Sequence, residues 1–135
     1  MEDRSFILVV DDDLDDLLLL SQAFKDIGHG DPVLYVGGGQ LMFDLLERTK
    51  INLYGLIILD LNMPGMDGME TLKRLKAHPD YKHIPVIIYS TSRNEMEKEL
   101  CIRSGATDYI TKPNSYQGHM AVCTRFQLLL KLSGL

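Results

Sequence analysis

The chain has 135 residues, of which 45% are hydrophobic and 24% are charged, and its formal net charge is −5. These values fit one globular domain with a core of its own. An acidic balance argues against nucleic acid or an anionic membrane surface as the main partner, and no apolar run approaches the ~18 residues of a membrane span.

The two cysteines indicate a reducing environment. Cys101 and Cys123 lie outside any CxxC or Cys/His pattern, so we expect reduced side chains that serve in packing. The sequence begins with an acidic stretch and a short apolar run, which does not fit a signal peptide. We therefore expect a cytoplasmic protein.

Short aliphatic runs alternate with segments of helical periodicity. In chain order, the expected elements are strand Ser5–Val10, helix Leu14–Ile27, strand Pro32–Val36, helix Gln40–Arg48, strand Gly55–Leu59, helix Asp67–Ala77, strand Pro85–Ser90, helix Arg93–Ser104, strand Thr107–Thr111 and helix Asn114–Leu132. Strands joined by helical crossovers run parallel, with right-handed connections. The pattern predicts an α/β fold of five βα units, a doubly wound (βα)5 parallel sheet, in one domain that covers residues 1–135.

Five residues with reactive side chains stand at the carboxyl ends of expected strands. Asp11 and Asp12 follow the first strand, and Asp60 follows the third. Ser90 closes the fourth strand, and Lys112 comes directly after the fifth. Parallel sheets bind ligands beyond the carboxyl ends of their strands. We therefore expect these residues to gather at one edge of the sheet.

Carboxylates gathered in this way repel one another, which raises their pKa values unless a cation is bound. All-oxygen ligands suit Mg²⁺ or Mn²⁺ rather than zinc. A cation beside a lysine and a hydroxyl is an arrangement for phosphoryl transfer, in which one carboxylate can become an acyl phosphate. A plainer explanation exists for the acidic run Asp11–Asp16, which could simply cap the following helix.

Four segments together resemble the receiver domains of two-component response regulators. They are "ILVVDDD" (Ile7–Asp13), "LDLNMPGMDG" (Leu59–Gly68), "PVIIYSTS" (Pro85–Ser92) and "GATDYITKP" (Gly105–Pro113). With "HPDYKHIPV" (His78–Val86), the chain is similar in detail to stand-alone receivers such as the cyanobacterial phytochrome partners. The resemblance covers nearly the whole chain. It implies a CheY-like, flavodoxin-like fold with strand order 2-1-3-4-5 and no output domain.

The resemblance also implies a role for each matching residue. Asp60 is the expected phosphorylation site. The expected ligands of Mg²⁺ or Mn²⁺ are Asp11, Asp12, Asp60 and the backbone carbonyl of Asn62. The expected phosphoryl-binding and switch residues are Ser90, Thr91, Lys112 and Tyr109, where Tyr109 turns inward when Ser90 moves. Pro113 is expected to follow Lys112 through a cis peptide bond.

The implied function is that of a phosphoacceptor signalling domain rather than an enzyme. A sensor histidine kinase or a histidine phosphotransfer protein would supply the phosphoryl group. The response would alter the face formed by helix Arg93–Ser104, strand Thr107–Thr111 and helix Asn114–Leu132. The last helix is apolar on more than one side, so we also expect a symmetric homodimer through this face.

Two other functions remain open. Haloacid-dehalogenase-type phosphatases use a first-strand DxD pair, which Asp11 and Asp13 match, but they have no acceptor at the third strand. A pseudo-receiver would keep the fold as an interaction module and never be phosphorylated.

Overall fold

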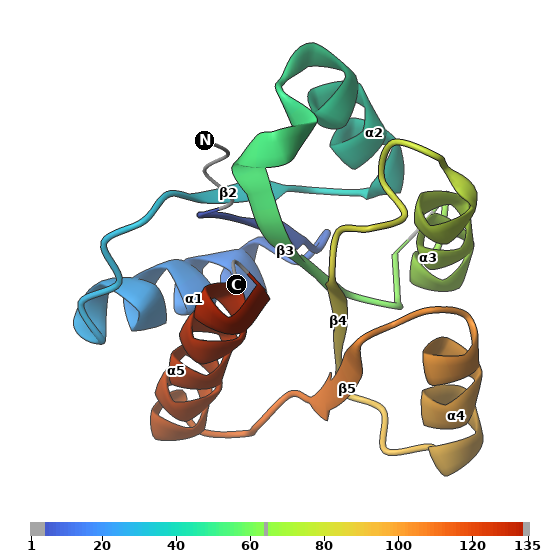
Figure 1. Cartoon of the computed structure of the whole chain (residues 1–135). Coiled ribbons are helices and arrows are strands. Elements are labelled where there is room, and N and C mark those ends of the chain that lie inside the picture. Colours follow the sequence, from blue (N-terminus) through green and yellow to red (C-terminus); the bar gives the residue numbers. More distant parts are fainter. Residues whose placement is uncertain (1–4, 64, 134–135) are drawn as a thin grey trace.

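The protein, described here by a computed structural model over residues 5–63 and 65–133, is built around one five-stranded sheet. The strands are β1 (Phe6–Val10), β2 (Val33–Val36), β3 (Tyr54–Leu59), β4 (Val86–Ser90) and β5 (Asp108–Thr111). They lie in the order β2-β1-β3-β4-β5, and every neighbouring pair is parallel (Figure 1). The predicted five-unit α/β fold and its strand order are confirmed.

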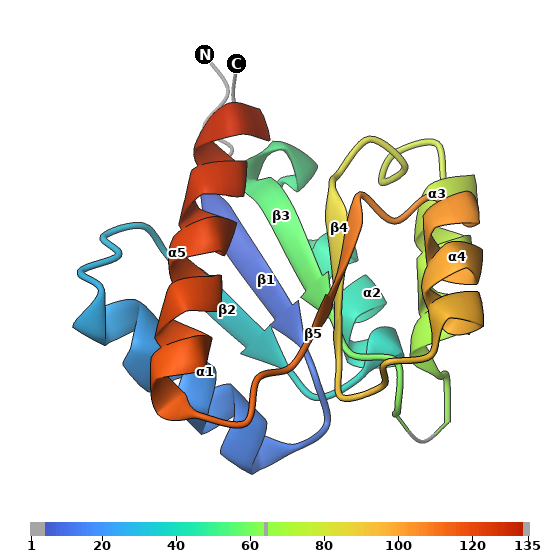
Figure 2. The ribbon, with the colours of Figure 1, turned by 90° about the horizontal axis from the view of Figure 1, so that it is seen from below.

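Helices cover both faces of the sheet. They are α1 (Leu14–Asp26), α2 (Gly39–Arg48), α3 (Gly68–Ala77), α4 (Glu95–Arg103) and α5 (Tyr116–Ser133). Helices α1 and α5 lie on one face, and α2, α3 and α4 lie on the other (Figure 2). A short 3₁₀ helix, Ile51–Leu53, precedes β3 and was not predicted. All ten predicted segments correspond to an observed element, and their ends differ by a few residues.

The central strand β3 is buried along its whole length, which explains its aliphatic sequence. Alternate residues of the strands enter two separate apolar clusters, one on each face. On the α1–α5 side, Phe24, Cys123 and Phe126 pack against the sheet. On the other side, Met42, Leu72 and Cys101 do so. The two cysteines thus lie in different clusters, free and buried, as expected of packing residues.

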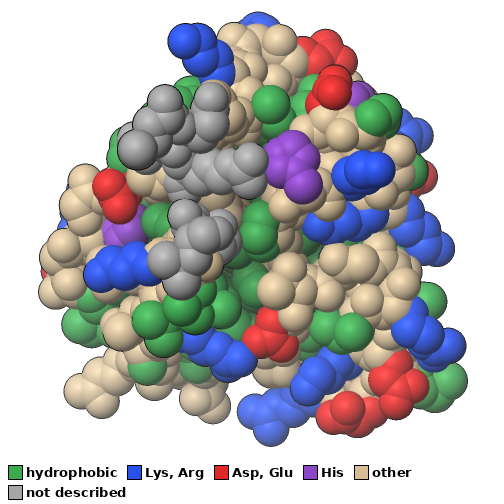
Figure 3. All heavy atoms as spheres, viewed as in Figure 1, with side chains coloured by type: hydrophobic (Ala, Val, Ile, Leu, Met, Phe, Trp, Pro, Cys, Tyr) green, Lys and Arg blue, Asp and Glu red, His purple; other side chains and the backbone are tan. Residues whose placement is uncertain are grey.

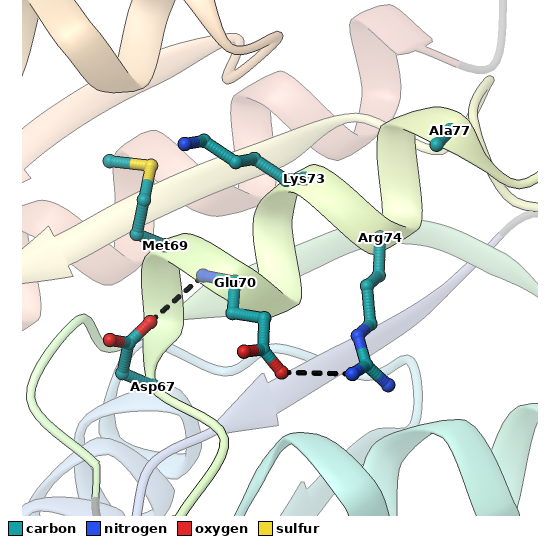
Figure 4. A pocket seen from close by; sticks show the side chains of 6 residues that line it. All are labelled: Asp67, Met69, Glu70, Lys73, Arg74 and Ala77. Atoms are coloured by element: carbon teal, nitrogen blue, oxygen red, sulfur yellow. Dashed lines mark hydrogen bonds and ion pairs between the residues drawn. The ribbon is translucent and has the colours of Figure 1, made fainter.

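Polar side chains fix where α1, α3 and α4 begin. Asp13 caps α1, and Asn94 caps α4. At α3, the Asp67 carboxylate accepts a 2.8 Å hydrogen bond from the backbone N–H of Glu70, whose own carboxylate lies 3.1 Å from Arg74 (Figure 4). These caps set the first turn of each helix close to the strand end that precedes it.

The surface carries charges of both signs. On the face seen in Figure 3, Lys and Arg side chains are interspersed with acidic and hydrophobic ones. In the part of the chain that the structure describes, no helix has the length and apolar character that a membrane span requires.

Candidate functional site

The carboxyl edge of the sheet brings together residues that are far apart in sequence. Backbone hydrogen bonds extend the strand ladder past the strand ends. Asp11 donates its N–H to Val36, and Asp60 donates to Val10 over 2.9 Å. Lys112 donates to the Ser90 carbonyl over 2.7 Å. The site residues are therefore held by the sheet itself rather than by mobile loops.

Three carboxylates form an acidic cluster at this edge. Asp11, Asp12 and Asp60 each place one oxygen within 4.8 Å of the others. Asp11 and Asp60 are buried, whereas Asp12 is exposed to solvent. This all-oxygen set, with one exposed member that leaves water access, fits a hard divalent cation such as Mg²⁺. The sequence prediction that these three side chains lie together is confirmed.

Burial is the main reason why the pKa of Asp60 rises from 3.8 to about 6. The neighbouring charge of Lys112 and a backbone hydrogen bond from Asn62 lower this pKa, while the charges of Asp11 and Asp12 raise it further. Placing a carboxylate at the end of a buried strand therefore produces a strained electrostatic site that a cation would relieve.

Lys112 reaches into the same cluster with a side chain that is only 7% exposed. Its Nζ donates to Asp11 over 2.9 Å and to Asp16 over 2.7 Å, and it lies 3.7 Å from Asp60. Burial alone lowers the Lys112 pKa, but the hydrogen bonds to Asp16 and Asp11 outweigh burial and leave the pKa raised. Lys112 is therefore a fixed positive charge inside the acidic cluster.

Asp16 is the site residue that sequence reasoning missed. The acidic run had a plain explanation as a helix cap, and Asp13 does cap α1 by accepting from the N–H groups of Asp15 and Asp16. The Asp16 side chain, however, contacts Lys112. Side chains of a helix lean toward its N-terminus, so an acid in the first turn after β1 faces the strand ends. This direction of helical side chains could have indicated from the sequence that Asp16 belongs to the site.

Three of the four expected phosphoryl-binding and switch residues lie on β4, β5 and the loop after β4, and the fourth, Lys112, directly follows β5. Ser90 is fully buried, and its Oγ accepts a 3.2 Å hydrogen bond from the N–H of Ser92, while Thr91 is exposed. Tyr109 is 6% exposed, and its single hydroxyl proton is shared between Glu97 of α4, at 2.7 Å, and the Ser92 carbonyl, at 3.1 Å. The aromatic ring therefore already occupies an inward position.

One structural expectation is wrong. Residues 5–63 and 65–133 contain no cis peptide bond, so Pro113 follows Lys112 through a trans bond. An X–Pro bond prefers trans by only about 0.5–1 kcal/mol, so the local chain decides the isomer. Here the trans isomer is compatible with Lys112 reaching Asp11. Asn62 is exposed beside the cluster, and its carbonyl as a cation ligand stays a prediction.

Comparisons with known proteins agree with this geometry. The family model described as "Response regulator receiver domain" matches residues 7–122. A chemotaxis protein CheY homologue of Campylobacter jejuni is 34% identical over 107 residues, which cover 79% of this chain and 80% of that protein. A Vibrio cholerae protein named "Probable cyclic di-GMP phosphodiesterase" is 33% identical over 117 residues, but the match covers only 25% of its length.

Among solved structures, the phosphorylated cyanobacterial phytochrome response regulator RcpA superposes with a TM-score of 0.83 and 27% identity. That match covers 95% of this chain and 94% of RcpA. The predicted similarity to phytochrome-associated receivers is thereby confirmed. Because the family model spans most of the chain and the fold agrees, this protein belongs to the response regulator receiver domain family.

Proposed function

We propose that this protein is a phosphoacceptor of a two-component phosphorelay. Asp60 receives the phosphoryl group from a phosphohistidine of a sensor histidine kinase or a histidine phosphotransfer protein, in a Mg²⁺-dependent reaction in the cytoplasm. The observation that carries the proposal is the buried Asp60 carboxylate, with Asp11 and Asp12 oxygens within 4.8 Å and the Lys112 Nζ at 3.7 Å. Membership of the receiver family supports it.

In the proposed transfer, a carboxylate oxygen of Asp60 attacks phosphorus and forms an O–P bond. The P–N bond of the phosphohistidine breaks, and its electron pair stays on the imidazole nitrogen. A pKa of about 6 leaves Asp60 mostly ionised at neutral pH, so the nucleophile is available. Lys112 offers positive charge to the phosphoryl oxygens, and Ser90 offers a hydroxyl donor.

The acidic cluster supplies the oxygen ligands for the cation. When bound, Mg²⁺ would neutralise charge on the transferring phosphoryl group. The residues proposed to hold it are Asp11, Asp12, Asp60 and the backbone carbonyl of Asn62.

The proposed output is a change in the α4–β5–α5 face. Phosphorylation adds about 1.5 to 2 negative charges and strong acceptors, toward which Ser90 can move. The Ser90 Oγ accepts from the N–H of Ser92, and the Ser92 carbonyl accepts from Tyr109. Tyr109 also connects β5 to α4 through Glu97, so we propose that movement of Ser90 reaches α4 along this path. Exposed apolar side chains on α4 and α5 offer a contact surface, namely Met96, Leu100, Ile102, Leu128 and Leu132. We propose that the protein forms a symmetric homodimer through this face. Light scattering with and without beryllofluoride tests the proposal. A monomeric mass in both conditions contradicts it.

Two competing functions are less well supported. A haloacid-dehalogenase-type phosphatase would need Asp13 as its second acid, but the Asp13 carboxylate caps α1. A pseudo-receiver would lack phosphoacceptor chemistry, whereas all the expected chemical positions are filled in this chain.

The deciding experiment is labelling by acetyl phosphate with Mg²⁺, followed by mass spectrometry of the labelled residue. We expect one phosphoryl group on Asp60, none on Asp60→Asn, and full labelling of the control Asp80→Asn, which removes an exposed carboxylate. Lys112→Ala should keep some labelling but weaken the response at α4. Labelling of Asp11 instead supports the phosphatase, and the absence of any Mg²⁺-dependent response to beryllofluoride supports the pseudo-receiver.

A further inference from the structure

The Lys112 ammonium is shared unequally among three carboxylates. Its Nζ is nearest to Asp16, at 2.7 Å, and farthest from Asp60, at 3.7 Å. A separation of 3.7 Å is too long for a hydrogen bond, so the directed bonds of Lys112 go to Asp11 and Asp16. The Lys112 ammonium is thus held on the β1–α1 side of the acidic cluster rather than on the β3 side.

We propose that Asp16 is a positioning residue that holds the Lys112 ammonium away from Asp60 in the unphosphorylated protein. The ion pair between Asp16 and Lys112 thereby weakens the contact of Lys112 with a phosphoryl group on Asp60. The effect on the phosphoryl contact rests on the proposed phosphoacceptor function, whereas the position of the Lys112 ammonium concerns the metal-free protein alone.

Asp16 is well placed to act in this way because α1 fixes its backbone. The Asp13 cap sets the first turn of the helix, and the buried Leu20 side chain packs the next turn against the sheet. The Asp16 side chain is only 27% exposed, and its partner is 7% exposed. The pair is therefore shielded from the screening that makes surface ion pairs weak.

The competition follows from the number of donors. A lysine ammonium has three N–H groups, and the bonds of two of them to Asp11 and Asp16 leave only one for an acceptor on Asp60. A phosphoryl group on Asp60 brings several charged acceptors that require the same ammonium. Removing the Asp16 charge leaves Lys112 fewer partners on the α1 side, so the ammonium should bind the phosphoryl group more strongly.

The chain provides a matched control one residue away. Asp15 carries the same charge in the same turn and is exposed, and among the residues that the structure describes its side chain forms no hydrogen bond or ion pair with Lys112. Asp15→Asn and Asp16→Asn therefore change the net charge equally, and only the second removes a partner of Lys112. Asp16→Glu keeps the charge and tests whether a carboxylate at this position restores the contact.

The first measurement detects the lysine ammonium directly, by ¹H–¹⁵N NMR of side-chain NH₃⁺ groups in metal-free protein, assigned with Lys112→Arg. We expect the protected Lys112 signal to shift and to exchange faster in Asp16→Asn, to stay unchanged in Asp15→Asn, and to recover in Asp16→Glu. An unchanged Lys112 signal in Asp16→Asn overturns the proposal.

The second measurement is the affinity for beryllofluoride, a phosphoryl mimic, at saturating Mg²⁺. Asp16→Asn should bind it about 3- to 10-fold more tightly than the wild type, and Asp15→Asn should stay within about twofold. Equal affinities of the two variants overturn the effect on the phosphoryl contact. If even the wild type binds no beryllofluoride, the phosphoacceptor proposal fails, and the ammonium signal still decides whether Asp16 positions Lys112.

Discussion

A Cβ atom built on Gly68 would lie 2.2 Å from the backbone carbonyl oxygen of Asp60. Gly68 is the first residue of α3, and its N–H donates to the Leu61 carbonyl over 3.0 Å. The helix therefore begins in direct backbone contact with the end of β3. Glycine is required at this position because the backbones of Gly68 and Asp60 approach each other closely. Asp60 is itself a member of the acidic cluster.

Replacing Gly68 by alanine should both destabilise the fold and disturb the acidic cluster. The added methyl group forces the start of α3 away from Asp60, and overpacking of this kind costs about 1–3 kcal/mol. Urea unfolding should show that loss, and calorimetry should show weaker Mg²⁺ binding. Gly30→Ala is the control, because a Cβ there meets nothing within 4 Å. Wild-type stability of Gly68→Ala would contradict a close contact between the start of α3 and the Asp60 backbone.

The electrostatic strain at Asp60 predicts that Asp60→Asn is more stable than the wild type when no metal is bound. Burial raises the folded-state pKa of Asp60 to about 6, above its unfolded value of 3.8, so the ionised form destabilises the fold at neutral pH. Removing the charge should add about 1–2 kcal/mol at pH 7.5 in EDTA, after allowance for solvent screening.

The sign of the pH dependence provides the check on that prediction. The penalty is fully present above pH 6 and disappears as the pH falls toward 3.8, because the carboxyl becomes protonated in both states. The advantage of Asp60→Asn in urea unfolding should therefore shrink between pH 7.5 and pH 5. A constant or growing advantage over that range contradicts the assigned pKa. Mg²⁺ should reduce the difference at pH 7.5 by stabilising the wild type alone.

Much of this arrangement could be predicted because the fold is encoded by local patterns. The aliphatic run Gly55–Leu59 indicated a buried strand, and the parallel topology then placed Asp60 beside the ends of other strands. The rule that strand ends meet at one edge is independent of side-chain detail, so Asp11, Asp12 and Lys112 could also be placed.

The residues that escaped prediction depend on side-chain direction and on contacts between distant segments. Asp16 belongs to an acidic run that already had an explanation, and only the lean of α1 side chains directs it to Lys112. The trans bond before Pro113 depends on a small energy difference that no motif reports. The inward position of Tyr109 depends on Glu97, which lies on a different element.

The hydroxyl of Tyr109 should stabilise the inward position of its ring. Tyr109→Phe removes the hydrogen bonds to the Ser92 carbonyl and to Glu97, and it should cost about 0.5–1.5 kcal/mol in urea unfolding. NMR shifts of α4 should change as well, because that helix loses its link to β5. Tyr116→Phe is the control, since it removes a tyrosine hydroxyl that bonds to Asp26 at the opposite end of α1 from the acidic cluster. The same α4 shifts in both variants would show that the effect is not specific to Tyr109.

His119 predicts a second pH dependence, opposite in sign to that of Asp60. His119 is 8% exposed on α5, and its Nδ1 lies 2.7 Å from the Tyr89 hydroxyl on β4. Burial lowers the His119 pKa below 6.5; Asp16 raises it in part, and Lys112 lowers it further. The folded protein therefore binds this proton less readily than the unfolded chain. The stability from neutral His119 is complete above pH 6.5 and is lost as the pH falls below it.

Because Asp60 and His119 act in opposite directions between pH 5 and pH 7.5, the wild-type profile mixes them. The effect of His119 should be read in the Asp60→Asn background, without metal, where stability should fall as the pH is lowered. Adding His119→Gln keeps a polar partner for Tyr89 but removes the titrating ring, so the profile should become flatter. Equal slopes with and without His119 would show that its protonation does not couple to folding. Since the Tyr89 ring also lies 5.8 Å from the Lys112 Nζ, the single variant His119→Gln, which keeps Asp60, tests through its Mg²⁺ affinity whether this buried pair influences the acidic cluster.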